Sequence, residues 1–158
     1  MIVILHNIRS LHNVGSIFRT ADAAGVEKIY LGGITPEPFD RFGKLRPQLG
    51  KVSLGAENFV SWEKLKSTVS VIKKLKKSDY QIFAIEQSKK SIPFYTLNVG
   101  SHALKKTALI LGNEIRGLPP SVLKLADQTL EIPMRGQKES LNVAVAFGIV
   151  IFSLIYKR

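Results

Sequence analysis

The chain has 158 residues, of which 45% are apolar and 22% are charged, and its 23 lysines and arginines against 12 acidic residues give a formal charge of +11. These proportions exclude a disordered chain and suit a domain with a sizeable core. The absence of cysteine excludes disulfides and cysteine metal sites and is compatible with a reducing cytoplasm. The positive charge favours a polyanionic partner such as nucleic acid, although a lysine-rich solvated surface would give the same count.

Short apolar runs alternate with helical patterns along the chain. Runs rich in β-branched and aromatic residues predict strands at 2–5, 28–31, 81–85, 108–111 and 128–132. This alternation predicts an α/β fold with a mainly parallel sheet and helices on both faces. No repeat, low-complexity tract or linker interrupts the pattern, so a single domain over residues 1–158 is expected.

Helical spacing predicts the elements between these strands. Apolar residues over 14–21 indicate a first helix, which Asn13 is placed to cap and Gly25 to terminate. An apolar stripe over 62–75 indicates a second helix, with Ser61 as its cap and lysines on its outer face. A further short helix is expected after the two prolines at 119 and 120, because proline suits the first turn of a helix.

The most apolar stretch is the last one, 141–156, which we expect to form a helix starting near Ser140. It is shorter than the about 20 apolar residues that a membrane span needs, and Asn142, Gly148 and Ser153 interrupt it. No membrane anchor is therefore expected. Apolar residues occur all around its circumference, which indicates burial on both sides. One side can cover the sheet, and the other is expected to meet a second subunit.

Three segments place glycine and polar side chains where open α/β sheets bind ligands. The first, HNVGSIFRTADAAG (12–25), contains Asn13 and Arg19, although a capped helix with an Arg19–Asp22 pair would give the same pattern. The second, LILGNEIRGLPP (109–120), follows a predicted strand and matches neither the P-loop nor the dinucleotide-binding pattern. The third, EIPMRGQKESLN (131–142), leads into the last helix, whose first backbone N–H groups await acceptors.

Together, in this order and spacing, the three segments resemble the motifs of the SpoU/TrmH family of RNA ribose 2′-O-methyltransferases, within the SPOUT superfamily. The resemblance runs over nearly the whole chain. It implies a C-terminal deep trefoil knot, a homodimer through the C-terminal helix and S-adenosylmethionine as the cofactor, with tRNA or rRNA as substrate. The cofactor-binding residues that it implies are Leu111, Gly112, Asn113, Ile132, Met134 and Leu141.

The resemblance also implies residues for the chemistry. Arg19 would act at the 2′-hydroxyl, and since a guanidinium resists deprotonation, its role would be to hold the adjacent phosphate and stabilise the developing alkoxide. No metal is expected, because a sulfonium methyl group is already electrophilic. The remaining catalytic candidates, which would hold the loops and Arg19 in place, are Asn13, Glu114, Ser140 and Asn142.

The basic side chains are candidates for contacts with RNA phosphates, although each could be an ordinary surface residue. The candidates are Arg41, Arg46, Arg116 and Arg135. Three other functions stay open: an RNA-binding or ribosome-assembly protein of the same fold without methyl transfer, an unrelated α/β small-molecule enzyme, and a base methyltransferase. The choice between tRNA and rRNA, and the nucleotide modified, is also open.

Overall fold

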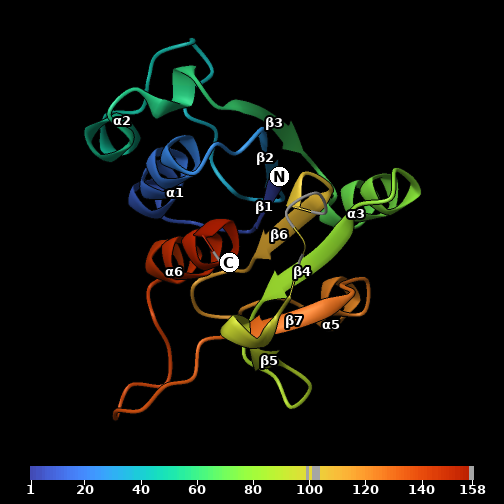
Figure 1. Ribbon diagram of the computed structural model, residues 1–158. Helices are drawn as coiled ribbons and strands as arrows, with labels where there is room; N and C mark the ends of the chain where they lie inside the picture. Colours follow the sequence, from blue (N-terminus) through green and yellow to red (C-terminus); the bar gives the residue numbers. More distant parts are fainter. Residues whose placement is uncertain (99, 101–103, 157–158) are drawn as a thin grey trace.

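The computed structural model describes residues 1–98, 100 and 104–156. Within them, seven strands form one sheet in the order β3-β2-β1-β6-β4-β7-β5, and neighbouring strands are parallel (Figure 1). This confirms the predicted parallel α/β class. The strands are β1 (Ile2–His6), β2 (Lys28–Gly32), β3 (Ser61–Leu65), β4 (Gln81–Ile85), β5 (Ile92–Pro93), β6 (Thr107–Leu111) and β7 (Gln128–Glu131).

Helices cover both faces of the sheet, as predicted. In β1, Val3 and Leu5 belong to the core beneath α1 and α6, while Ile2 and Ile4 belong to the core beneath α3 and α5. Figure 1 shows α1, α2 and α6 on the left of the sheet and α3 and α5 on the right. The helices are α1 (Leu11–Ala23), α2 (Pro47–Ser53), α3 (Thr68–Lys77), α5 (Pro120–Leu123) and α6 (Val143–Tyr156), with 3-10 turns η1 (Ala56–Asn58) and η2 (Phe94–Thr96).

The predicted helix over 62–75 is wrong in its first part, and so is Ser61 as its cap. Residues up to Leu65 form the edge strand β3, which pairs in parallel with β2. The helix α3 begins only after Ser67, whose hydroxyl accepts a hydrogen bond from the N–H of Ser70 at 3.3 Å. Pairing with β2 satisfies backbone groups that a helix start would leave open, so the tertiary contact outweighs the local periodicity.

The start of α1 also differs from the prediction. Ser10 is the cap, and its hydroxyl accepts a hydrogen bond from the Asn13 N–H at 3.3 Å. Asn13 therefore lies in the first turn, which leaves its side chain available for contacts outside the helix. Gly25 follows the end of α1 with a positive φ of 67°, as expected of a residue that terminates a helix.

The last helix, α6, begins at Val143 and not near Ser140. The Asn142 side-chain oxygen accepts a hydrogen bond from the Ala144 N–H at 2.9 Å and so caps its first turn. One side of α6 contributes Phe147 to the core shared with α1. Among the residues described, no helix is both long enough and apolar enough to cross a membrane.

Candidate active site

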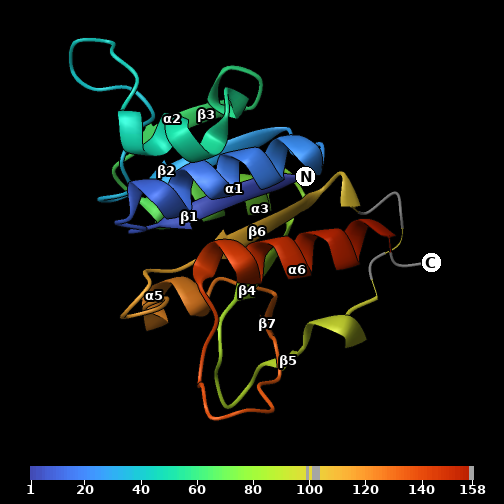
Figure 2. The same ribbon diagram turned by 90° about the vertical axis from the view of Figure 1, so that its left-hand side faces the viewer.

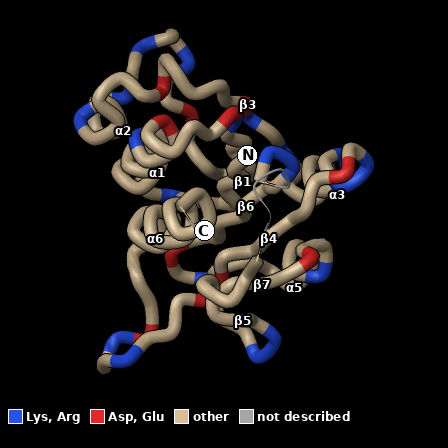
Figure 3. Tube along the Cα trace, viewed as in Figure 1, with Lys and Arg blue, Asp and Glu red and all other residues tan. Residues whose placement is uncertain are grey.

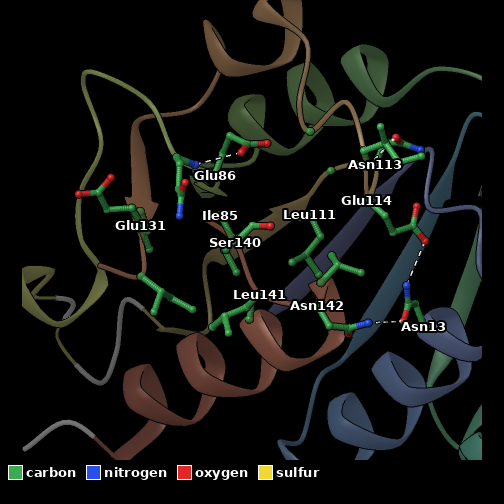
Figure 4. Close-up of a pocket in the computed structure, with 18 of the residues that line it drawn as sticks. Asn13, Ile85, Glu86, Leu111, Asn113, Glu114, Glu131, Ser140, Leu141 and Asn142 are labelled. Atoms are coloured by element: carbon green, nitrogen blue, oxygen red, sulfur yellow. Dashed lines mark hydrogen bonds between the residues drawn. The ribbon is translucent and has the colours of Figure 1, made fainter. Parts of the chain in front are cut away.

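A pocket of about 320 Å³ opens at the carboxyl ends of β4, β6 and β7, beside the start of α6 (Figure 4). Parallel strands bring their carboxyl ends to one edge of the sheet, so segments far apart in the sequence meet there. The volume lies within the range of small-molecule sites. The pocket brings together ten of the predicted residues: Asn13, Leu111, Gly112, Asn113, Glu114, Ile132, Met134, Ser140, Leu141 and Asn142.

A chain of hydrogen bonds joins the three predicted segments at one end of this pocket (Figure 4). The Asn13 amide donates to Glu114 Oε1 at 3.1 Å, and the Asn142 amide donates to Asn13 Oδ1 at 3.0 Å. Asn142 also caps α6, as described above. One continuous network therefore sets the spacing between α1, the loop after β6 and the start of α6.

Glu114 is the centre of this network. Besides Asn13, its carboxylate accepts hydrogen bonds from the backbone N–H of Arg9 at 3.1 Å and of Ser10 at 3.0 Å. Burial acts to raise the pKa of Glu114, but hydrogen bonds from the N–H groups of Ser10, Glu114 itself and Arg9 and from the Asn13 amide outweigh it. The pKa consequently lies below its usual range, and the carboxylate is ionised at neutral pH.

We expect Glu114→Gln to lower the free energy of unfolding near pH 7 by about 1 kcal/mol, after allowance for solvent screening. The glutamine amide has only one acceptor oxygen, and its NH₂ group would face the N–H groups that donate to the carboxylate in the wild type. The native pKa of Glu114 is lowered, so the ionised carboxylate adds to the free energy of unfolding. This contribution is complete above the pKa of a glutamate in the unfolded chain, and it is lost as pH falls through the pKa of the folded protein. Urea unfolding across acid and neutral pH measures the difference.

The control for this prediction is Glu139→Gln, since Glu139 is an exposed glutamate in the loop before α6 whose side chain accepts no hydrogen bond from the described residues. The control should unfold like the wild type at every pH. A difference between Glu114→Gln and wild type that stays constant down to acid pH would show that the ionised carboxylate is not the stabilising form.

The loop after β6 is closely packed at Gly112. A Cβ atom at this position would lie 2.6 Å from the Gly117 carbonyl carbon and 2.7 Å from the Leu118 nitrogen, so no side chain fits there without moving backbone. The Asn113 amide donates to the Asn7 carbonyl at 2.8 Å and ties the loop to the end of β1. Glycine at this position therefore lets the two ends of the loop pack together, and the packed loop forms part of the pocket lining.

Two carboxylates in the pocket were not predicted. Glu86 accepts a hydrogen bond from the Leu118 N–H at 2.8 Å and so braces the loop after β6. Glu131 accepts one from the Ser91 hydroxyl at 2.5 Å. In the sequence, only their position at the carboxyl end of a predicted strand indicates that they could belong to a ligand site. Carboxylates among apolar side chains suit a ligand that carries both a ring system and hydroxyl or amino groups.

Arg19 is absent from the residues that line the pocket. It is exposed on α1, and the pair with Asp22 that the sequence also allowed is not formed. Six residues of helix place it about 9 Å along the axis from Asn13 and on a different side of the helix. Within one protomer, the structure thus assembles four of the five predicted catalytic residues and leaves out the fifth.

The candidate RNA contacts lie around the same edge of the sheet. Arg41, Arg116 and Arg135 are exposed, whereas Arg46 is half-buried and its Nε donates to the Glu37 carbonyl at 3.1 Å. Arg116 borders a second cavity, of about 580 Å³, on the far side of the loop after β6. Figure 3 shows basic residues at the tips of loops at the top and at the bottom of the view.

Comparison with known proteins places this geometry in a family. A model of the SpoU rRNA Methylase family matches residues 1–152. A curated relative, the tRNA (guanosine(18)-2′-O)-methyltransferase of Aquifex aeolicus, is 33% identical over 100% of this chain and 70% of its own length. The solved structure of an AdoMet-bound rRNA methyltransferase from Sinorhizobium meliloti has a TM-score of 0.85 and 30% identity, covering 97% of this chain and 54% of that one.

A further structure, which concerns the 2-OH methylation of C/U34 on tRNA, has a TM-score of 0.79 and 28% identity over 99% of this chain and 93% of that one. The chain spans 70% of the length of the Aquifex relative and 58% of the length of another curated relative, a 23S rRNA (guanosine-2′-O-)-methyltransferase of Blochmanniella floridana. The family match covers nearly all of the sequence and includes the three segments that form the pocket. The chain therefore belongs to the SpoU rRNA methylase family.

Proposed function

We propose that residues 1–158 form a single methyltransferase domain that moves a methyl group from S-adenosylmethionine to a ribose 2′-hydroxyl of tRNA or rRNA. The observation that carries this proposal is the Glu114–Asn13–Asn142 network, which joins the three family segments at one end of a ligand-sized pocket. The activity named for the Aquifex relative and the AdoMet in the Sinorhizobium structure support the reaction and the cofactor.

The pocket suits S-adenosylmethionine by the chemistry of its lining. The tightly packed loop at Gly112 forms part of the lining, and the carboxylate of Glu131 lies among apolar side chains. The bound cofactor supplies an electrophilic sulfonium methyl group, so the reaction needs no metal. The residues that would hold it all line the pocket: Leu111, Gly112, Asn113, Ile132, Met134 and Leu141.

The protein must then align the ribose hydroxyl with the methyl group and handle one proton. Glu114 is a positioning residue and not the proton acceptor, since its carboxylate is occupied by N–H donors and its pKa is lowered. Arg19 would hold the phosphate next to the ribose and stabilise the developing alkoxide, with the proton passing to water or RNA. Ser140 and Asn142 would shape the start of α6 where the hydroxyl enters.

A homodimer through α6 would complete the site. Val145 is 50% exposed and Ile149 is 38% exposed on the side of α6 that faces away from the core. α1 lies against α6 near this side, because a Cβ at Gly148 would be 3.9 Å from Thr20, the neighbour of Arg19. A second copy seated on this apolar stripe would cover it and bring Arg19 of one subunit towards the pocket of the other.

Three further features complete the proposal. The chain from β7 to α6 would pass through a preceding loop as a deep trefoil knot, as the resemblance to the SPOUT superfamily implies, and a crystal structure would test this by its chain trace. The protein would act in the cytoplasm, where its RNA substrates are found. The arginines at 41, 46, 116 and 135 would contact phosphates around the pocket.

The test is transfer of labelled methyl from S-adenosylmethionine to tRNA and rRNA pools from cells that lack this protein. The wild type should label one pool. The phosphodiester bond on the 3′ side of the labelled nucleotide should resist alkali, because ribose methylation blocks the 2′-hydroxyl that alkaline cleavage needs. Arg19→Ala should lower the rate by about 100-fold or more, the cost of losing one alkoxide-stabilising group, and Arg19→Lys should keep part of it. RNA binding without label in either pool would contradict the proposal and favour an RNA-binding or ribosome-assembly protein of the same fold.

A further inference from the structure

The loop between β2 and α2 contains a small hairpin over residues 39–45. An antiparallel bridge pairs Phe39 with Leu45 at its base. At its tip, Asp40 Oδ1 accepts hydrogen bonds from the N–H of Phe42 and of Lys44, both at 2.9 Å, and Gly43 takes a positive φ of 75°. These contacts give the backbone of the tip one conformation.

The 39–45 hairpin is anchored to the body of the protein at its base. The Phe39 ring stacks on Trp62 of β3, with ring centroids 6.3 Å apart. On the other side, the Arg46 N–H donates to the Pro38 carbonyl at 2.9 Å, and its side chain donates to Glu37 as described above. The hairpin is therefore a preorganised projection, which lowers the entropy that its tip residues would lose on binding.

The tip presents an aromatic ring to solvent. Phe42 is 79% exposed, and the guanidinium of Arg41 lies 4.7 Å from its ring centroid. The cation thus occupies one face of the ring and leaves the other face open. Tips of tight turns are usually polar, so an apolar ring held there in one conformation requires an explanation.

The charges around this ring define what can dock on it. Arg41, Lys44 and Lys51 are exposed nearby in sequence, while Asp40, the acidic residue within the hairpin, is occupied by the turn. Figure 2 shows the hairpin projecting at the upper left, from the edge of the sheet where the loops after β6 and β7 also lie. A flat π face next to cations on the pocket side of the molecule suits a nucleotide: a base on the ring and phosphates on the cations.

We propose that the 39–45 hairpin binds the RNA substrate by stacking an unpaired nucleobase on Phe42, with Arg41 and Lys44 on the flanking phosphates. This inference rests on the proposed function, because it concerns the RNA presented to the pocket. Base faces are hidden inside a duplex, so the hairpin selects a single-stranded loop. The hairpin contributes binding away from the transferred methyl group, and its loss changes KM for RNA and not kcat.

The experiment compares three replacements of Phe42 with one matched control. Phe59 is 78% exposed and directly follows the η1 turn, so Phe59→Ala removes an equally exposed ring elsewhere. Phe42→Ala should raise KM for RNA about tenfold, the typical cost of losing one base-stacking ring, with kcat unchanged. Phe42→Trp should keep the wild-type KM, Phe42→Leu should resemble Phe42→Ala, and Phe59→Ala should have no effect.

A second measurement detects stacking directly and does not depend on methyl transfer. Substrate RNA with 2-aminopurine at unpaired positions should lose fluorescence at one position on binding wild type, and not on binding Phe42→Ala. A wild-type KM for Phe42→Ala would overturn the inference. A wild-type KM for Phe42→Leu, or an equal rise of KM in Phe59→Ala, would also overturn it, because either result favours a general apolar contact such as a protein partner. Quenching that depends on Phe42 in a protein that transfers no methyl would uphold the hairpin and reject the proposed activity. A protein that binds no RNA would overturn both.

Discussion

A Gly112→Ala variant is expected to bind S-adenosylmethionine between about 5-fold and 150-fold more weakly than the wild type, as a cost of about 1–3 kcal/mol for overpacking predicts. The added Cβ would meet backbone atoms of Gly117 and Leu118 at 2.6 and 2.7 Å, and backbone cannot rotate aside as a side chain can. The loop after β6 must then shift. It is held at both ends, by Asn113 on the Asn7 carbonyl and by Glu86 on Leu118, so the strain is concentrated at the pocket.

Calorimetric titration measures the affinity, and circular dichroism with thermal unfolding verifies that the variant is folded. Gly136→Ala is the matched control: Gly136 lies in the third segment, yet a Cβ there would meet no atom within 4 Å. Its affinity should equal that of the wild type. A folded Gly112→Ala variant with wild-type affinity would place the cofactor elsewhere and remove the main support for the cofactor-binding set.

Much of the fold could be predicted because the central strands are buried on both faces. β4 matches its predicted range, and β1, β2, β6 and β7 agree within a residue or so, since continuous apolar runs between turn signals have few other interpretations. The edge strands β3 and β5 could not be found this way. Trp62 and Leu65 fit a helical spacing as well as a strand, and only pairing with β2 decides between them.

The members of the site were easier to predict than their contacts. Order and spacing of three segments selected ten residues that line one pocket. The side chain of Asn13, however, bonds to a residue 101 positions away in the sequence, and no local pattern distinguishes that role from a helix cap. Glu86 was missed for a related reason, because a single carboxylate after a strand is common and its bond to Leu118 spans 32 positions.

The sidedness of α6 was also beyond the sequence pattern. Its residues are apolar around the whole circumference, so periodicity cannot tell the core side from a docking side. In the structure, Phe147 and Ile151 are fully buried in the core that α6 shares with α1, and the exposed side carries Val145 and Ile149. This assignment determines which substitutions test the dimer: a charge at Phe147 would unfold the protomer, whereas a charge at Val145 would act on the proposed interface alone.

Mixed dimers of Arg19→Ala and Asn142→Ala subunits are expected to recover activity that neither variant has alone. Each variant should lose about 100-fold or more in methyl transfer, through the alkoxide contact and through the network at the pocket. If Arg19 acts in the partner's pocket, a mixed dimer contains one site with both Asn142 and Arg19 intact and one site without either. Random mixing would then restore about a quarter of all sites.

Two affinity tags isolate the mixed dimer, and labelled methyl transfer to RNA measures its activity. Val145→Glu in both subunits is the control, because a buried charge at the proposed interface should prevent dimers and abolish the recovery. Isolated mixed dimers without recovered activity would show that Arg19 serves its own subunit, whereas wild-type activity of Arg19→Ala alone would show that it has no part in the reaction. Recovery would instead explain why Arg19 stands exposed and outside the pocket that the other four catalytic candidates share: in one chain the site is incomplete, and the second copy supplies the missing cation.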